Sequence, residues 1–335
     1  MKIEVFKMYK ASDERYDNMK IRRAGNSGLQ LPALSFGMWH SFGDDANFKD
    51  SREVMLNAFD KGIFSYDLAN NYGPGSGAAE RMFGQVYKND LKPYRDELVI
   101  TTKAGYHMWP GPYGSFSARK TLIAALDRSL ERMGLDYVDI YYSHRFDPNT
   151  SLEETAEALD STVRSGKALY VGISNYNGEQ TREIIKYFKE LHTPFVVNQA
   201  SYNMLNRSAE TDGTIDALKE NNDGLVAYGP LAEGILTDKY LNGLPDDLKL
   251  HFTNSFMMEN KDEVVKRLNQ LNELAKNRDQ TLAQMSLAWL LHDPVVTSVV
   301  TGASDPKHLD SNLKALDNLD FTEDELTRIN EILKK

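Results

Sequence analysis

The sequence contains no cysteine, and this absence excludes a disulfide framework, a thiol nucleophile and a metal site built on thiolates. It also lacks an apolar run of about eighteen residues, the length that a membrane-spanning helix needs. Charged residues interrupt the first part of the chain, so no secretory leader is indicated. We therefore expect a cytoplasmic protein without a membrane partner.

Positive charge is scarce: 39 Lys and Arg residues stand against 49 Asp and Glu residues, a formal net charge of −10. Nucleic acid would be repelled by this balance, so we do not expect it as a partner. The 335 residues are 41% hydrophobic and can bury a large core. No linker, repeat or low-complexity segment divides them, so we expect one domain over residues 1–335, with residues 1–19 as an N-terminal extension.

Short runs of β-branched and aromatic residues alternate with amphipathic stretches from about residue 31 onward, a pattern typical of a parallel sheet with crossover helices. The predicted strands are 33–37, 63–66, 98–102, 137–143, 168–173, 195–198, 225–228 and 296–301. The predicted helices are 52–61, 77–88, 117–133, 152–165, 178–191, 213–221, 264–276 and 306–316. Eight such pairs predict an α/β fold, the (β/α)8 TIM barrel.

Two segments depart from strict alternation. Residues 20–23 and 29–32 flank the turn sequence Gly-Asn-Ser-Gly at 25–28, which predicts an N-terminal β-hairpin that closes the amino-terminal end of the barrel. Residues 282–291 form an apolar helix in addition to the helix at 264–276, so we expect extra helices near the C-terminus.

Four residues capable of proton chemistry follow predicted strands. Asp67 and Tyr72 come after the run 63–66, Lys103 closes the run 98–102, and His144 follows the run 137–143. In a barrel the carboxyl ends of the strands meet at one rim, where catalytic groups are found. We therefore expect these four side chains to lie together, in a site without a metal ion.

A phenol, an ammonium, a carboxylate and an imidazole suit the reduction of an aldehyde. Negative charge develops on the aldehyde oxygen as hydride reaches carbon, so a proton donor is needed there, and Tyr72 is the candidate. A free tyrosine has a pKa of about 10, so Lys103 would favour the phenolate, while Asp67 would hold Lys103 by an ion pair. His144 would orient the carbonyl oxygen. A Schiff base on Lys103 is a second chemistry that these residues allow, but the spacing of Asp67 and Tyr72 favours hydride transfer.

The motifs Asp-Leu-Ala-Asn-Asn-Tyr-Gly at 67–73, Thr-Lys at 102–103 and Ser-His-Arg at 143–145 resemble, in this order, the catalytic tetrad of the aldo-keto reductase superfamily. The resemblance covers nearly the whole chain. Within that superfamily the sequence resembles the bacterial relatives of potassium-channel β-subunits, through Gly-Met-Trp-His at 37–40 and Gly-Lys-Ala-Leu-Tyr-Val-Gly-Ile-Ser-Asn at 166–175. This resemblance implies an NADPH-dependent oxidoreductase that reduces a small aldehyde of the triose phosphate or methylglyoxal type.

The resemblance also implies a nicotinamide site. Residues such as Ser174, Asn175 and Gln199 hold the carboxamide in the family, and an aromatic residue like Tyr228 stacks on the ring. Trp39 stands where the family lines the pocket shared by cofactor and substrate. The full set of cofactor-binding residues implied in this way is Trp39, Asp67, Ser174, Asn175, Gln199, Tyr228, Gly229, Pro230, Leu231, Ala232, Gly234, Lys239, Lys249, Gly302, Ser304, His308 and Asn312.

Within this set, Lys239 and Lys249 resemble the basic contacts to the 2′-phosphate of NADP. Three positions depart from the family, which usually has a basic residue at Asp305, Arg or Gln at His308 and Glu at Ser311. An acidic side chain beside a phosphate is unfavourable. NADPH is the expected cofactor, and NAD(H) is the alternative.

The expected substrate pocket consists of Trp39, Tyr72, Trp109, His144 and Arg207, the last as a grip for a substrate phosphate. The resemblance implies a homo-oligomer, a tetramer or an octamer. A different function is a nicotinamide-binding regulatory subunit with little turnover, as in the channel β-subunits. Those subunits commonly have Asn at the position of His144, so the histidine favours turnover.

Overall fold

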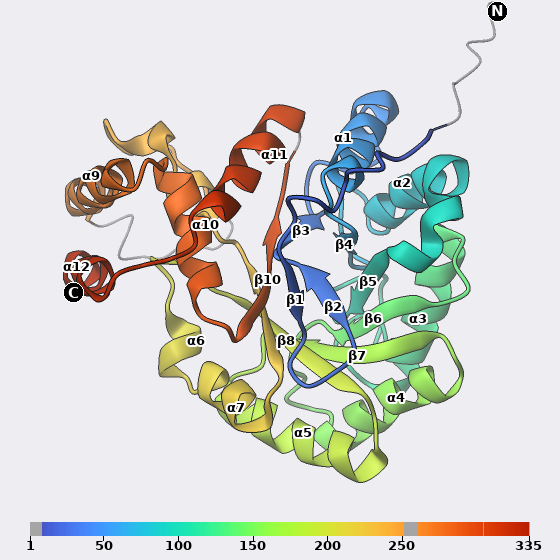
Figure 1. The fold of residues 1–335 in the computed structure, drawn as a ribbon. Helices are drawn as coiled ribbons and strands as arrows, with labels where there is room; N and C mark the ends of the chain where they lie inside the picture. The colour runs from blue at the N-terminus through green and yellow to red at the C-terminus, as the bar shows by residue number, and fades with distance from the viewer. Residues whose placement is uncertain (1–8, 251–259, 304, 335) are drawn as a thin grey trace, which may run out of the picture.

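The computed structural model describes residues 9–250, 260–303 and 305–334. Eight parallel strands close into a barrel in the order β10-β3-β4-β5-β6-β7-β8-β9 (Figure 1). The strands are β3 (Leu34–Gly37), β4 (Ser65–Asp67), β5 (Val99–Ala104), β6 (Val138–Ser143), β7 (Ala168–Ser174), β8 (Phe195–Ser201), β9 (Gly224–Tyr228) and β10 (Val296–Thr301). The predicted (β/α)8 fold is confirmed.

Helices cover the outside of the barrel. Those that follow the strands are α1 (Phe48–Asp60), α2 (Ala78–Val86), α3 (Arg119–Met133), α4 (Leu152–Arg164), α5 (Gly178–Leu191), α7 (Thr214–Asn221) and α11 (Pro306–Leu313). The further helices are α6 (Ser208–Thr211), α9 (Lys261–Asn277), α10 (Leu282–His292) and α12 (Glu323–Leu333). Short 3₁₀ and π turns are η1 (Tyr87–Leu91), η2 (Lys92–Glu97), η3 (Ala232–Gly234), η4 (Asp238–Tyr240) and η5 (Lys314–Asp317).

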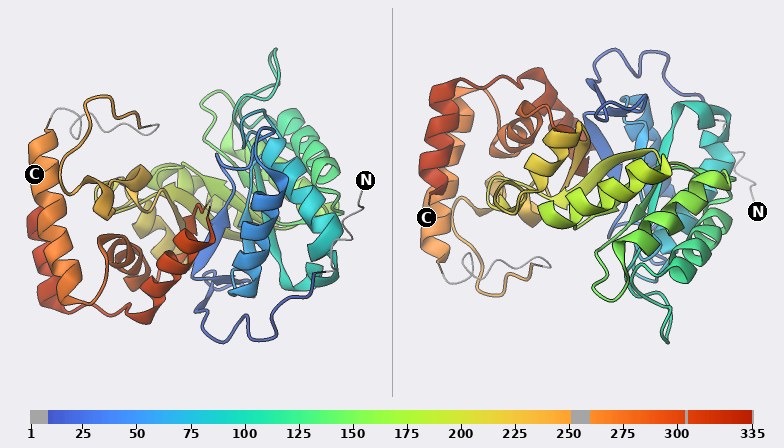
Figure 2. Two further views of the ribbon diagram at one scale, coloured as in Figure 1. Left: turned by 90° about the horizontal axis from the view of Figure 1, so that it is seen from above. Right: turned by 90° about the horizontal axis from the view of Figure 1, so that it is seen from below.

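The extra helices near the C-terminus form a second layer on one side of the barrel. α10 is buried over most of its surface, as its apolar sequence predicts, and α9 and α12 lie side by side farther out (Figure 2). None of the helices that the structure describes is both long and apolar enough to span a lipid bilayer.

Local sequence explains where the barrel helices begin and end. In α5 the side chain of Asn177 accepts the N–H of Gln180, and the Gln180 side chain accepts the N–H of Asn177, a reciprocal cap. The helix buries an apolar face that includes Ile184 and Phe188. It ends where His192 adopts a left-handed conformation with φ of 56°.

The predicted hairpin forms from β1 (Ile21–Arg23) and β2 (Gln30–Pro32), which pair antiparallel. The N–H of Asn26 in its turn donates to the carbonyl of Asn222, 2.9 Å away and just before β9. The hairpin therefore covers the amino ends of the strands, which leaves the carboxyl ends open for a site.

Candidate active site

The carboxyl ends of neighbouring strands bring the predicted catalytic residues to one rim. Asp67 is the last residue of β4, and His144 directly follows β6. Lys103 lies inside β5, paired with Tyr142, and not just after the strand as we expected. The strand continues through it because the ladder to β6 extends as far as Ala104 and Ser143.

A fully buried ion pair forms the floor of the site. Lys103 Nζ donates to Asp67 Oδ2 and to the carbonyl oxygen of Leu68, each at 2.7 Å. Asp67 Oδ1 accepts hydrogen bonds from Thr101 Oγ1 at 3.0 Å and Gln199 Nε2 at 2.9 Å. Burial lowers the pKa of Lys103 below its ordinary value, and the charge of Asp67 opposes that shift. Both oxygens of the carboxylate are therefore engaged, which offsets the cost of burying its charge.

Tyr72 lies next to this pair. Lys103 Nζ is 3.3 Å from the Tyr72 hydroxyl oxygen and 4.8 Å from the centre of its ring. Burial raises the pKa of the Tyr72 phenol well above its ordinary value, and the Asp67 carboxylate raises it further. The phenol is therefore protonated at neutral pH. Lys103 Nζ donates to the same hydroxyl oxygen, and the expectation that it favours the phenolate stays a prediction.

His144 packs edge-on between two aromatic rings, with its ring centre 5.7 Å from that of Tyr72 and 4.6 Å from that of Tyr106. Burial lowers the pKa of His144 well below its ordinary value, and the positive charges of Lys103 and Arg145 lower it further. The imidazole is therefore neutral and carries one N–H donor. Within the described residues its buried Nδ1 has no hydrogen-bond partner.

A cavity of about 620 Å³ opens at this rim. Many of the predicted site residues line it: Trp39, Asp67, Tyr72, His144, Asn175, Gln199, Tyr228, Gly229, Pro230, Leu231, Gly234, Gly302 and Asn312. Lining residues that sequence reasoning missed include Phe42, Asn71, Tyr106, Glu233, Val300 and Ala303. Tyr106 comes two residues after β5, so the rule that strand ends supply site residues could have found it.

Other predicted residues do not line the cavity. Ser174 is buried beside it and its Oγ accepts from Asn175 Nδ2 at 3.1 Å. Ala232 belongs to η3, and Trp109 packs under Arg128, whose guanidinium carbon is 5.3 Å from the indole centre. The basic residues Lys239, Lys249 and His308 are exposed on the surface. Ser304 lies outside the described residues.

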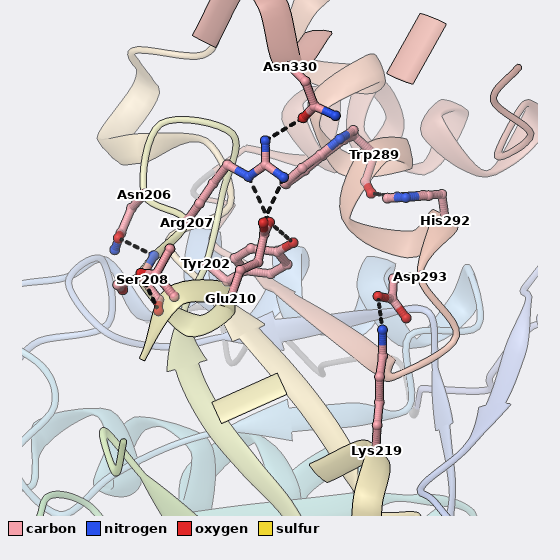
Figure 3. Close-up of polar contacts among 11 residues, drawn as sticks. Tyr202, Asn206, Arg207, Ser208, Glu210, Lys219, Trp289, His292, Asp293 and Asn330 are labelled. Carbon is pink, nitrogen blue, oxygen red and sulfur yellow. Dashed lines mark hydrogen bonds and ion pairs between the residues drawn. The ribbon is translucent and has the colours of Figure 1, made fainter. Parts of the chain in front are cut away.

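Arg207 also lies elsewhere. Its guanidinium donates twice to Glu210, each time at 2.7 Å, and once to Asn330 Oδ1 at 2.5 Å (Figure 3). It also stacks over Trp289, 5.3 Å from the ring centre. Arg207 therefore joins the loop after β8 to the C-terminal helices, and the expected contact with a substrate phosphate has no support in its position.

Comparison with known proteins agrees with this geometry. The sequence model of the Aldo/keto reductase family matches residues 33–334. This chain belongs to that family. The reductase is 50% identical over 329 residues to L-glyceraldehyde 3-phosphate reductase of Escherichia coli K12, covering 96% of this chain and 94% of the relative. It is 33% identical to a probable voltage-gated potassium channel subunit beta of Arabidopsis thaliana, covering 89% of this chain and 92% of that protein.

A solved structure of a thermostable aldo-keto reductase in complex with the inhibitor epalrestat superposes with a TM-score of 0.74 at 29% identity, over 94% of this chain and all of the other. The reductase is thus an oxidoreductase of a family that uses nicotinamide cofactors.

The polar groups around the cavity suit a carboxamide, which both donates and accepts hydrogen bonds. Gln199 Oε1 accepts no hydrogen bond within the described residues, and the buried Oδ1 of Asn71 has no partner there. Asn175 is already held in place, because its Nδ2 donates to the His144 carbonyl at 3.0 Å and its Oδ1 accepts from the Tyr228 hydroxyl at 2.7 Å. The reductase therefore offers preformed groups for a nicotinamide at this rim.

Proposed function

We propose that the reductase catalyses NADPH-dependent reduction of a small aldehyde to the alcohol, with Tyr72 as the general acid. The observation that carries this proposal is the contact of 3.3 Å between the Tyr72 hydroxyl and the ammonium of Lys103 at the wall of the cavity. A protonated phenol beside a fixed cation can give up its proton at the moment when the aldehyde oxygen gains charge.

Each residue then has a distinct part in the reaction. A nicotinamide held at this rim would supply the hydride. Tyr72 donates its proton to the substrate oxygen, and Lys103 stabilises the phenolate that remains. Asp67 keeps Lys103 charged in spite of its burial, and the neutral imidazole of His144 donates a hydrogen bond to the carbonyl oxygen.

Ser174, Asn175 and Gln199 would hold the carboxamide, and Tyr228 would lie against the ring. For the 2′-phosphate of NADPH we propose Lys239 and Lys249, which are exposed and carry no neutralising carboxylate within the described residues. The test is a comparison of kcat/KM for NADPH and NADH. NADPH preferred by the wild type, with the preference reduced in Lys239→Met and Lys249→Met, supports this assignment, and equal use of both cofactors contradicts it.

We infer that Asp305 weakens NADPH binding less than its position in the sequence suggests. Its carboxylate caps α11, where Oδ1 accepts the N–H of Lys307 at 2.8 Å. A carboxylate engaged by the end of its own helix presents less negative charge to a neighbouring phosphate.

The substrate class that we propose is a short aldehyde of the triose phosphate or methylglyoxal type. It rests on the 50% identity to a reductase named for L-glyceraldehyde 3-phosphate and on the size of the cavity. Purified protein is incubated with NADPH and a panel of short aldehydes, with and without phosphate, and the oxidation of NADPH is followed by absorbance.

The 33% identity to a channel β-subunit supports a second candidate, a cofactor-binding regulatory subunit. Tight NADPH binding without any oxidation by the aldehyde panel would favour it over the first.

We also propose a cytoplasmic, homo-oligomeric enzyme with a single barrel domain. Sedimentation of the purified chain tests the assembly.

A further inference from the structure

The described residues that line the cavity include no cation that is free to bind an anionic substrate. None of the described residues that line it is a lysine or an arginine, whereas Asp67 and Glu233 are acidic. Asp67 is already paired with Lys103, so these residues offer no positive charge to a phosphate group. Arg207 cannot compensate, because Glu210 and Asn330 already hold its guanidinium. A phosphorylated aldehyde therefore needs a different positive group near the mouth.

Arg145 lies behind a lining residue and not in the cavity wall itself. It directly follows His144, and its guanidinium carbon is 4.7 Å from the ring centre of Tyr106, which lines the cavity. On the other side the same carbon is 4.0 Å from the ring centre of Phe116. Two aromatic rings thus hold the guanidinium, and this reduces the entropy that it would lose on binding an anion.

The guanidinium of Arg145 uses only part of its hydrogen-bond donors within the described residues. Its Nε donates to the carbonyl oxygen of Gly105 at 2.9 Å. Within residues 9–250, 260–303 and 305–334, its two terminal nitrogens have no hydrogen-bond partner and no carboxylate pairs with it. Two N–H groups in a fixed plane match the oxygens of a phosphate.

The backbone at Gly105 allows this close approach. A Cβ atom built there would lie 3.1 Å from Cβ of His144 and 3.4 Å from Cγ of Arg145. The charge of Arg145 is also near enough to contribute to the lowered pKa of His144. Arg145 and the imidazole that faces the reaction are therefore electrostatic neighbours.

More positive charge surrounds the same loop. Arg128 lies over Trp109, and Lys120 Nζ is 4.3 Å from the ring centre of Tyr113. Both cations lie against the aromatic residues of the loop after β5, in a chain whose net charge is −10.

We propose that Arg145 binds the phosphate group of phosphorylated aldehyde substrates at the mouth of the cavity, and so determines the preference of the enzyme for them. This proposal rests on the proposed function, because it concerns the substrate of that reaction. Arg145 acts on the end of the substrate remote from the carbonyl, so its contribution appears in KM more than in kcat.

The test compares glyceraldehyde 3-phosphate with glyceraldehyde as substrates of the wild type, Arg145→Gln and Arg145→Lys. Arg207→Gln is the matched control, since it removes the same side chain from a position where Glu210 and Asn330 already hold the guanidinium. In Arg145→Gln the ratio of the two kcat/KM values falls about 10- to 100-fold through a higher KM for the phosphorylated aldehyde, because charge-assisted hydrogen bonds are lost. Arg145→Lys restores part of the ratio, since it retains the charge but not the fork. Arg207→Gln leaves the ratio as in the wild type.

The proposal is overturned if the ratio in Arg145→Gln equals that of the wild type, or if it falls equally in Arg207→Gln. A second measurement needs no variant: glycerol 3-phosphate, which has no carbonyl, must inhibit glyceraldehyde reduction by the wild type competitively, whereas glycerol must not. Absence of that inhibition also overturns it. A wild type that oxidises no NADPH with any aldehyde contradicts the proposed function itself, which is a separate outcome.

Discussion

The side-chain amide of Gln199 donates a hydrogen bond of 2.9 Å to Asp67 Oδ1, across 132 residues of sequence. Thr101 donates to the same oxygen, so Oδ2 is left for Lys103. Each oxygen of the carboxylate thus has its own partners. Because Gln199 also lines the cavity, it connects the ion pair to the place where we propose that the nicotinamide binds.

Thr101 offers a way to weaken this arrangement without changing the wall of the cavity. Thr101→Val keeps the shape of the side chain but removes one donor from a buried carboxylate, so we expect a loss of about 1.5–3 kcal/mol in the free energy of unfolding. Thr101→Ser keeps the hydroxyl and serves as the control. Urea denaturation measures both. Equal stability of the valine and serine variants would show that the hydroxyl contributes nothing to Asp67.

Lys103 and Asp67 should depend on each other for stability. Lys103→Met leaves an unpaired carboxylate in the interior, and we expect about 3–5 kcal/mol of destabilisation. Asp67→Asn is expected to be costly for the corresponding reason. The double variant Asp67→Asn/Lys103→Met removes both charges and should be less destabilised than the sum of the two single variants. Additive losses in urea denaturation would argue against a coupled pair.

The pKa of His144 predicts how stability changes with pH. This pKa is lowered by burial in the folded state, so below the ordinary value of 6.5 the unfolded chain takes up a proton that the folded chain does not. Stability therefore falls as the pH decreases from about 7 to 5. His144→Asn removes this titration and should show a smaller loss over the same range. Parallel curves for the wild type and the variant would contradict the assignment.

The pKa of Asp223, which lies just before β9, predicts the opposite dependence of stability on pH. Burial raises its pKa from 3.8 to about 7, and the charge of Lys189 opposes the shift. The folded chain therefore holds a proton that the unfolded chain releases, and this contribution to stability is lost as the pH rises from about 4 to 7. Asp223→Asn should gain stability relative to the wild type between pH 5 and 8. Thermal melts of both proteins at pH 5 and pH 8 check this prediction. A difference in melting temperature between variant and wild type that is the same at both pH values would refute it.

The barrel and its rim could be predicted because their signals are local. Strand β10 and helix α5 have the predicted ends, and the turn at 25–28 forms the predicted hairpin. Helix α12 was not predicted, although Thr322 and Glu325 form a capping box, which is a sequence signal for the start of a helix. The division of the chain into domains stays a prediction.

The parts that sequence could not supply depend on distant partners. Arg207 is occupied by Asn330, 123 residues later in the chain, and nothing in the local motif reveals that contact. The direction of the pKa shift of Tyr72 depends on how many atoms surround the phenol, which only the packed structure shows. For the same reason the motif Ser-His-Arg at 143–145 does not reveal that the guanidinium of Arg145 lies between the rings of Tyr106 and Phe116.

Replacement of Tyr72 by phenylalanine tests the central claim most directly, with NADPH oxidation and NADPH affinity measured on the same preparation. We predict that Tyr72→Phe lowers kcat about 10²- to 10⁴-fold, the usual contribution of a general acid, and leaves the Kd for NADPH unchanged. Tyr137→Phe, the same change just before the amino-terminal end of β6, is the control. Undiminished turnover in Tyr72→Phe would contradict the account.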